Sequence, residues 1–172
     1  MSFNDEYFDI GCWTSQKLKY HKISNNRRVK NLQINHGEIW YCDLGFNIGA
    51  EKNKMRPVLV ISNNNIGRTG KVVVICLTDT SGKLNAKNLP AQDSWYLLYS
   101  DTTNPDNMCS PNRIIPKNNT PYDFLEKDSM VQCEEIRTVS KARFNTSKGR
   151  IGVITSSDLE FIKKKFKRTY NL

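Results

Sequence analysis

From residue 37 onward, short apolar and β-branched runs alternate with polar turn residues along the chain. Runs of this kind predict β-strands separated by loops, and no helical period interrupts them before residue 157. Residues 72–77 are apolar on both faces of a strand, which is typical of a central strand. We therefore expect six strands, at residues 39–44, 58–61, 71–78, 95–99, 129–138 and 150–154, with Pro57 opening the second.

The C-terminal pattern changes to the helical period, which predicts a helix over about residues 157–169. Its apolar stripe consists of Leu159, Ile162, Phe166 and Tyr170. Ser157 and Glu160 fit a capping box, and Glu160 with Lys164 fits a favourable pair four residues apart. The opposite face is either a solvated basic surface or an RNA contact, and it carries Lys163, Lys165, Lys167 and Arg168.

Two segments lack a regular pattern. Residues 1–33 show no sustained period and end in a polar, basic stretch, so we expect an N-terminal extension that is partly ordered at best. Residues 34–172 then form one domain, with a long insertion around residues 100–124 that is either functional or mobile. Aromatic residues in and beside the insertion could stack on bases or simply pack a strand: Trp95, Tyr96, Tyr99, Tyr122 and Phe124.

The charge favours a polyanionic partner. The chain has 26 Lys and Arg against 17 Asp and Glu, a net charge of +9, and most of the excess lies near the two ends. Nucleic acid is the leading partner class, although a solvated basic surface would give the same balance. No apolar run is long enough to span a bilayer and the first residues do not resemble a signal peptide, so we expect a cytoplasmic protein without membrane contact.

Several kinds of chemistry are improbable for this sequence. The two histidines, His21 and His36, lie outside the predicted strands, which argues against a histidine pair or a catalytic triad. The five cysteines are widely spaced without a C-x-x-C pair, which indicates reduced packing residues. No zinc, EF-hand or phosphate-loop motif occurs, so we expect neither a metal nor another cofactor.

Polar residues at strand ends remain as candidates. Arg56 stands where a polar loop enters a buried strand, and Thr78 stands where the next buried strand leaves. Two such loops on one rim of a barrel would bring a guanidinium and a hydroxyl together, which suits a scissile phosphate. The same two loops make Lys52, Lys54, Thr80, Ser81 and Lys83 the expected RNA contacts.

These residues belong to an ordered series of motifs that resembles the MazF/PemK toxins. The series runs through Gly37–Tyr41, Gly49–Glu51, Arg56–Ile61, Thr78, Leu89–Pro90, Asp128–Ser129 and Glu134–Thr138. The resemblance implies a mainly β, SH3-like barrel of the MazF/PemK/CcdB type with a C-terminal helix. It also implies a homodimer, a cognate antitoxin partner, and operator DNA contact only through the complex with that antitoxin.

The resemblance further implies the activity: sequence-specific, metal-independent cleavage of single-stranded mRNA, which inhibits growth. Arg56 and Thr78 would be catalytic and Glu51 a substrate contact. The 2′-hydroxyl of the RNA would be the nucleophile, leaving a cyclic phosphate, which restricts the substrate to RNA. The chain departs from the family pattern in the bulky stretch at residues 52–55, in Glu135 where Gln is usual, and in its insertion.

Two other interpretations stay open. A non-catalytic nucleic-acid-binding barrel would share the charge and the strands, but it would leave a long RNA intact in EDTA. An inhibitor of a protein target, of the gyrase-poison type, would arrest growth with relaxed plasmid DNA and undamaged transcripts.

Overall fold

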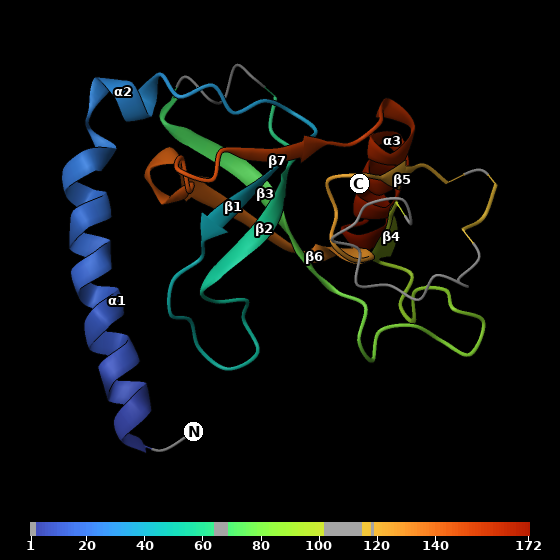
Figure 1. Cartoon of the computed structure of the whole chain (residues 1–172), viewed down its shortest axis with the longest axis horizontal. Coiled ribbons are helices and arrows are strands. Elements are labelled where there is room, and N and C mark those ends of the chain that lie inside the picture. The colour runs from blue at the N-terminus through green and yellow to red at the C-terminus, as the bar shows by residue number, and fades with distance from the viewer. Residues whose placement is uncertain (1–2, 64–68, 102–114, 118) are drawn as a thin grey trace.

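Seven strands form one strongly curled sheet in the order β5-β4-β6-β3-β2-β1-β7 (Figure 1). The computed structural model describes residues 3–63, 69–101, 115–117 and 119–172. The strands are β1 (Glu38–Asp43), β2 (Met55–Val60), β3 (Lys71–Asp79), β4 (Trp95–Ser100), β5 (Pro121–Tyr122), β6 (Ser129–Ser140) and β7 (Arg150–Val153). The expected mainly β barrel with a C-terminal helix is confirmed.

All six expected strands are present, and β5 is an addition of two residues that pairs parallel to β4. So short a strand carries no period that a sequence pattern could reveal. The second strand begins earlier than expected: Pro57 lies within β2, opposite Tyr41 of β1. Proline is tolerated there because the ladder between β2 and β3 starts only at Val58.

The central strand β3 separates the two larger apolar clusters of the core. Ile75 and Leu77 face the cluster beneath the C-terminal helix, whereas Val74 and Cys76 face the other side of the sheet. All four side chains are buried, so the prediction of a central strand is confirmed. Among the described cysteines, Cys42, Cys76 and Cys133 are buried free thiols, as expected for packing residues, whereas Cys12 is exposed.

The C-terminal helix α3 (Ser156–Thr169) covers one face of the sheet with Leu159 and Ile162. The expected capping box at Ser157 is wrong: Thr155 is the N-cap and accepts a bond from the Asp158 amide, because the helix begins before Ser157. Glu160 bonds to Lys163, three residues on, at 2.7 Å rather than to the expected Lys164.

A buried carboxylate ties this helix to the sheet. Asp158 is only 5% exposed and accepts hydrogen bonds from the hydroxyls of Tyr96 in β4 and Tyr122 in β5. Burial and the neighbouring carboxylate raise the pKa of Tyr122 to about 12. Both tyrosines therefore stay protonated donors, so one acid joins three elements.

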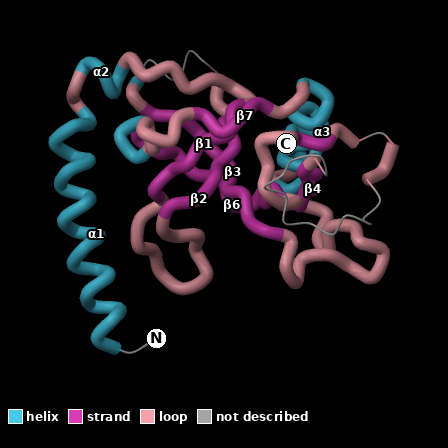
Figure 2. The backbone as a smooth tube through the Cα atoms, viewed as in Figure 1, coloured by secondary structure: helices cyan, strands magenta, loops and turns pink. Residues whose placement is uncertain are grey.

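The N-terminal extension contains two helices, α1 (Phe3–Ser24) and α2 (Arg27–Lys30). The tube in Figure 2 shows α1 running along the side of the molecule away from α3. The side chains of α1 that lie toward the barrel recur at helical spacing but are polar or aromatic: Asp9, Trp13, Gln16 and Tyr20. This composition explains why the sequence shows no apolar period here.

The aromatic residues near the insertion mainly pack. Trp95, Tyr99 and Tyr122 are each under 10% exposed, so the packing interpretation holds for these three and base stacking does not. Most of the predicted insertion, residues 102–114 and 118, lies outside the described residues. No helix among the residues that the structure describes is long and apolar enough to cross a membrane.

Candidate active site

The candidate catalytic pair lies where the ladder between β2 and β3 ends. The last paired residues are Val58 and Cys76, and Arg56 and Thr78 each lie two residues beyond them on their strands. Because side chains alternate along a strand, Arg56 shares the face of Val58, and Thr78 shares the face of Cys76. The structure therefore brings Arg56 and Thr78 to one face and one end of the sheet, both half-buried.

Charged groups gather around the buried Cys76 on this face. Burial, and next the negative charge of Glu135, raise the pKa of the Cys76 thiol to about 11, while Arg137, Lys52 and Arg56 act in the opposite direction. The thiol stays protonated and serves as a small packing group. The charges that act on this thiol include three cations, a combination suited to an anionic substrate.

The loop at residues 44–54, which we call the first loop, folds over this set. The Arg56 Nε donates to the carbonyl of Asn53 at 2.9 Å. A guanidinium has five N–H donors, so fixing Nε orients the group while its terminal nitrogens remain suited to a bidentate contact with phosphate.

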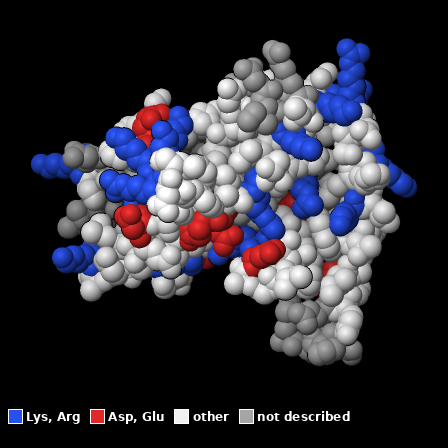
Figure 3. Space-filling model, turned by 180° about the vertical axis from the view of Figure 1, so that it is seen from behind, with Lys and Arg blue, Asp and Glu red and all other residues white. Residues whose placement is uncertain are grey.

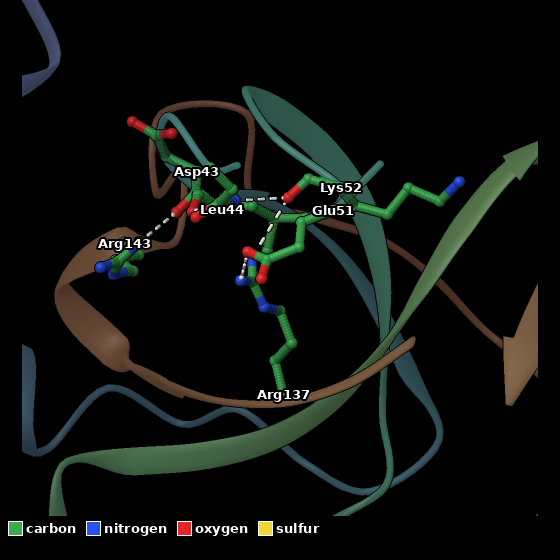
Figure 4. Close-up of polar contacts among 7 residues, drawn as sticks. Asp43, Leu44, Glu51, Lys52, Arg137 and Arg143 are labelled. Atoms are coloured by element: carbon green, nitrogen blue, oxygen red, sulfur yellow. Dashed lines mark hydrogen bonds and ion pairs between the residues drawn. The ribbon is translucent and has the colours of Figure 1, made fainter. Parts of the chain in front are cut away.

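Arg137 holds the far side of the first loop. From β6, its terminal nitrogens donate to the Lys52 carbonyl at 3.1 Å and to the Glu51 carboxylate at 3.2 Å. Figure 4 shows the Arg137 side chain rising toward the loop and Glu51 pointing back to it, while the Lys52 ammonium extends away. The loop therefore crosses from β1 to β6 over the end of the sheet.

The base of the first loop is closed by backbone bonds. The Leu44 amide donates to the Lys54 carbonyl at 2.9 Å, and the Lys54 amide donates to Gly45 at 2.7 Å. Asn47 bridges within the loop by donating to the carbonyls of Leu44 and Lys52. This loop is consequently an ordered structure and not a flexible connection.

The loop at residues 80–94, the second loop, closes on itself beside Thr78. Lys83 forms an ion pair with Asp79 at 3.2 Å, and the Lys83 amide donates to the Thr80 carbonyl at 3.0 Å. The Ser81 amide donates to the Asp79 carboxylate. Burial raises the pKa of Asp79, but the bonds from Lys83 and Ser81 outweigh it and leave this pKa below its usual value, so the Asp79 charge is held within the turn.

Comparison with known proteins gives the family. Residues 35–170 match the PemK-like, MazF-like toxins of type II toxin-antitoxin systems. The chain belongs to this family. The toxin is also 28% identical over 131 residues to "Endoribonuclease MazF9" of Mycobacterium tuberculosis (strain ATCC 25618 / H37Rv), a match that covers 74% of this chain and 90% of that protein.

Solved structures with the same fold include MazF toxins. The toxin resembles MazF of Deinococcus radiodurans with a TM-score of 0.52 at 16% identity, covering 83% of this chain and 100% of that one. It also resembles an endoribonuclease of a mycobacterial species solved with its cognate antitoxin, with a TM-score of 0.51 at 20% identity, covering 81% of this chain and 97% of that one. The family match leaves out residues 1–34, and so all of α1.

Of the residues predicted to contact RNA, three already form ion pairs within the protein. Glu51 of the toxin is bonded to Arg137, Lys54 lies 3.6 Å from Asp9 of α1, and Lys83 is held by Asp79. The Lys52 charge lowers the pKa of the Cys76 thiol, although its ammonium extends away from Arg137 (Figure 4). Thr80, half-buried, and Ser81, exposed, directly follow β3.

Arg137 is a site residue that the sequence pattern did not predict. Arg137 occupies the motif Glu134–Thr138, and its pairing with Val74 sets it on the face of Cys76. An arginine inside a predicted strand was the available signal. Its partner loop, 85 residues away in the chain, could not be inferred from that signal.

On the face seen from behind, the basic side chains of the described residues do not form one continuous stripe. Figure 3, which views the toxin from behind, shows Lys and Arg at several separate places with acidic side chains among them. On α3, Lys163 and Lys165 bond to Glu160 and Asp93. Within the described part of the chain, no cluster of His, Cys, Asp and Glu could hold a metal ion.

Proposed function

We propose that this toxin is an endoribonuclease that cuts single-stranded RNA at the face formed by Arg56, Thr78 and Arg137. The observation that carries the proposal is the position of Arg56 and Thr78 on one face at the end of one ladder, beside a cluster of cations. Membership of the toxin family and the similarity to an endoribonuclease support the same reaction.

The proposed reaction is an internal transfer of the phosphoryl group. The ribose 2′-oxygen forms a bond to phosphorus while the bond from phosphorus to the 5′-oxygen breaks. The proton of the 2′-hydroxyl leaves, and the departing 5′-oxygen gains one, so the products are a cyclic phosphate and a 5′-hydroxyl. The substrate supplies its own nucleophile, which makes the reaction specific for RNA and requires neither metal nor cofactor.

Each side chain has a distinct part in this proposal. Arg56 pairs with the non-bridging oxygens and stabilises the charge that grows on them, and Thr78 positions the same phosphate through its hydroxyl. Lys52 and Lys54, with Thr80, Ser81 and Lys83 of the second loop, contact the flanking backbone. Glu51 contacts the substrate once it releases Arg137.

The biological setting follows from the family. We propose that the toxin acts as a homodimer on mRNA in the cytoplasm, that a cognate antitoxin neutralises it, and that operator DNA is contacted only through that complex. Growth inhibition would then result from loss of transcripts.

The test compares Arg56→Ala with Arg27→Ala, an exposed arginine on α2 that serves as the matched control. With purified protein and a long single-stranded RNA in EDTA, we expect Arg56→Ala to lower the cleavage rate by roughly 10²–10³-fold, since one stabilising donor is lost. Arg27→Ala should cut normally. Mapping of the cleaved ends should find cyclic phosphate and 5′-hydroxyl termini.

Other outcomes decide between the alternatives. Intact RNA with salt-sensitive binding by the wild type would support a non-catalytic binding barrel. Relaxed plasmid DNA with undamaged transcripts after induction would support an inhibitor of a protein target. Unchanged cleavage by Arg56→Ala would contradict the assignment of this residue.

A further inference from the structure

Helix α1 packs directly on the base of the first loop. The Trp13 indole lies against Gly45 so closely that a Cβ at residue 45 would overlap the ring, and Gly45 has a φ of +92°. The Arg143 guanidinium lies over the same indole, 5.1 Å from its centroid, and donates to the Asp43 carbonyl. Trp13 is thus held between the loop and the short helix after β6.

Two polar contacts extend this packing along α1. The Tyr20 hydroxyl donates to the Asp43 carboxylate at 2.8 Å, and that carboxylate also accepts the Gly45 amide at 3.0 Å. Asp9 lies 3.6 Å from the Lys54 ammonium. Each contact joins α1 to a residue at one end of the first loop, where the loop meets β1 or β2.

A short path leads from this contact to Arg56. The Gly45 carbonyl, beneath Trp13, accepts the amide of Lys54, which has a φ of +62°. Few residues other than glycine adopt this conformation, so surrounding contacts must hold it in place. Asn53, the preceding residue, presents its carbonyl to the Arg56 Nε.

We propose that α1 is a positioning element for the catalytic arginine, with Trp13 as the principal positioning residue. The helix fixes the base of the first loop, the loop fixes the Asn53 carbonyl, and that carbonyl orients the Arg56 guanidinium toward the phosphate. This inference rests on the proposed function. It assigns a positioning role to a segment that the family match does not cover.

The effect should fall on the chemical step and not on RNA binding. A guanidinium stabilises the transition state only while it is correctly oriented, so a loss of orientation raises the barrier of the chemical step. The flanking cations still bind the RNA. Loss of Trp13 should therefore lower kcat and leave KM nearly unchanged.

The experiment compares Trp13→Ala with Phe8→Ala in the full-length protein. Phe8 lies on the same helix but is 72% exposed, so it controls for loss of an aromatic side chain. We expect kcat to fall roughly 10- to 100-fold in Trp13→Ala, because small displacements of a catalytic group have effects of this size. Phe8→Ala should match the wild type, and Trp13→Phe should recover part of the rate.

Tyr20→Phe guards against simple unfolding, since it removes one hydroxyl and keeps the ring. Tyr20→Phe should lower kcat several-fold at an unchanged melting temperature. Hydrogen exchange at the Lys54 amide should be faster in Trp13→Ala and in Tyr20→Phe than in the wild type. Equal rates for Trp13→Ala and Phe8→Ala, a faster Trp13→Ala enzyme, or a loss confined to KM would each overturn the proposal.

Arg56→Ala, measured in parallel, separates the two proposals. If Arg56→Ala is inactive and Trp13→Ala is fully active, the positioning role fails and the nuclease assignment stands. If Arg56→Ala is fully active, the proposed site itself fails.

Discussion

The two loops beside the candidate site have similar compositions, but different contacts hold them in place. The first loop (44–54) is anchored from outside: α1 packs on its base, and Arg137 of β6 binds its tip. Close to Thr78, the second loop (80–94) is held mainly from within, by the bonds that join Asp79, Ser81 and Lys83. Both loops are polar and basic in the sequence, so composition alone does not separate them.

This difference indicates how each loop can affect the chemistry. Contacts between distant parts of a chain couple a loop to the whole fold, whereas local bonds make a turn that forms independently. Changes in the first loop should therefore reach Arg56, and changes in the second should remain local.

Among changes to the anchors of the two loops, the largest effect should come from releasing the first loop from Arg137. In Arg137→Ala the Lys52 carbonyl and the Glu51 carboxylate lose their partner, and the site loses a cation. We expect kcat/KM for RNA cleavage to fall about 100-fold, because orientation and charge are lost together.

Arg137→Lys is the matched control, since it keeps the charge but not the paired geometry of the guanidinium. It should recover binding affinity more than it recovers kcat. Wild-type activity in Arg137→Ala would show that the anchor of the loop is irrelevant to cleavage.

A smaller effect should distinguish lysines in the two loops. Lys52 acts on the buried Cys76 among the site charges, whereas Lys83 is paired with Asp79. Lys52→Ala should weaken RNA binding several-fold and reduce the salt slope by about 0.7, the value for one phosphate contact on a single strand.

Lys83→Ala should change the affinity and the slope less, because its charge is already balanced within the turn. Titrations at several salt concentrations measure both quantities. An equal loss for the two lysines would contradict the contrast between the loops.

The smallest effect concerns acid and the second loop. The folded pKa of Asp79 lies below its ordinary value of 3.8. A depressed carboxyl pKa stabilises the turn above that ordinary value, and the contribution disappears as the pH falls through the folded pKa. The amide resonances of Ser81 and Lys83 should therefore shift only in strong acid, and Asp79→Asn should abolish the shift. A shift near neutral pH would contradict this.

Much of the fold could be predicted because its signals are local. Alternation and β-branched runs indicate six of the strands, and the position of Arg56 and Thr78 at strand ends indicates the face that they share. The buried cysteines follow from their apolar surroundings. Each of these inferences uses only residues that are neighbours in the chain.

The remaining features depend on contacts between residues far apart in the chain. Helix α1 packs the half-buried Trp13 against Gly45 of the first loop, and its sequence has no apolar stripe that would predict this contact. The ion pair between Arg137 and Glu51 joins positions 86 residues apart. The start of α3 was misplaced because Thr155 and Ser157 are both good capping residues, and the Tyr122 hydroxyl, which accepts the Thr155 amide at 2.9 Å, favours the earlier one.

The buried Asp158 also bears on the order of assembly during synthesis. Its tyrosine partners in β4 and β5 precede it by 62 and 36 residues, so both emerge from the ribosome well before it. Contacts of such long sequence separation close late in folding. The bonds from the two tyrosines can therefore form only after translation has passed Asp158, and a sheet that forms earlier lacks this link to α3.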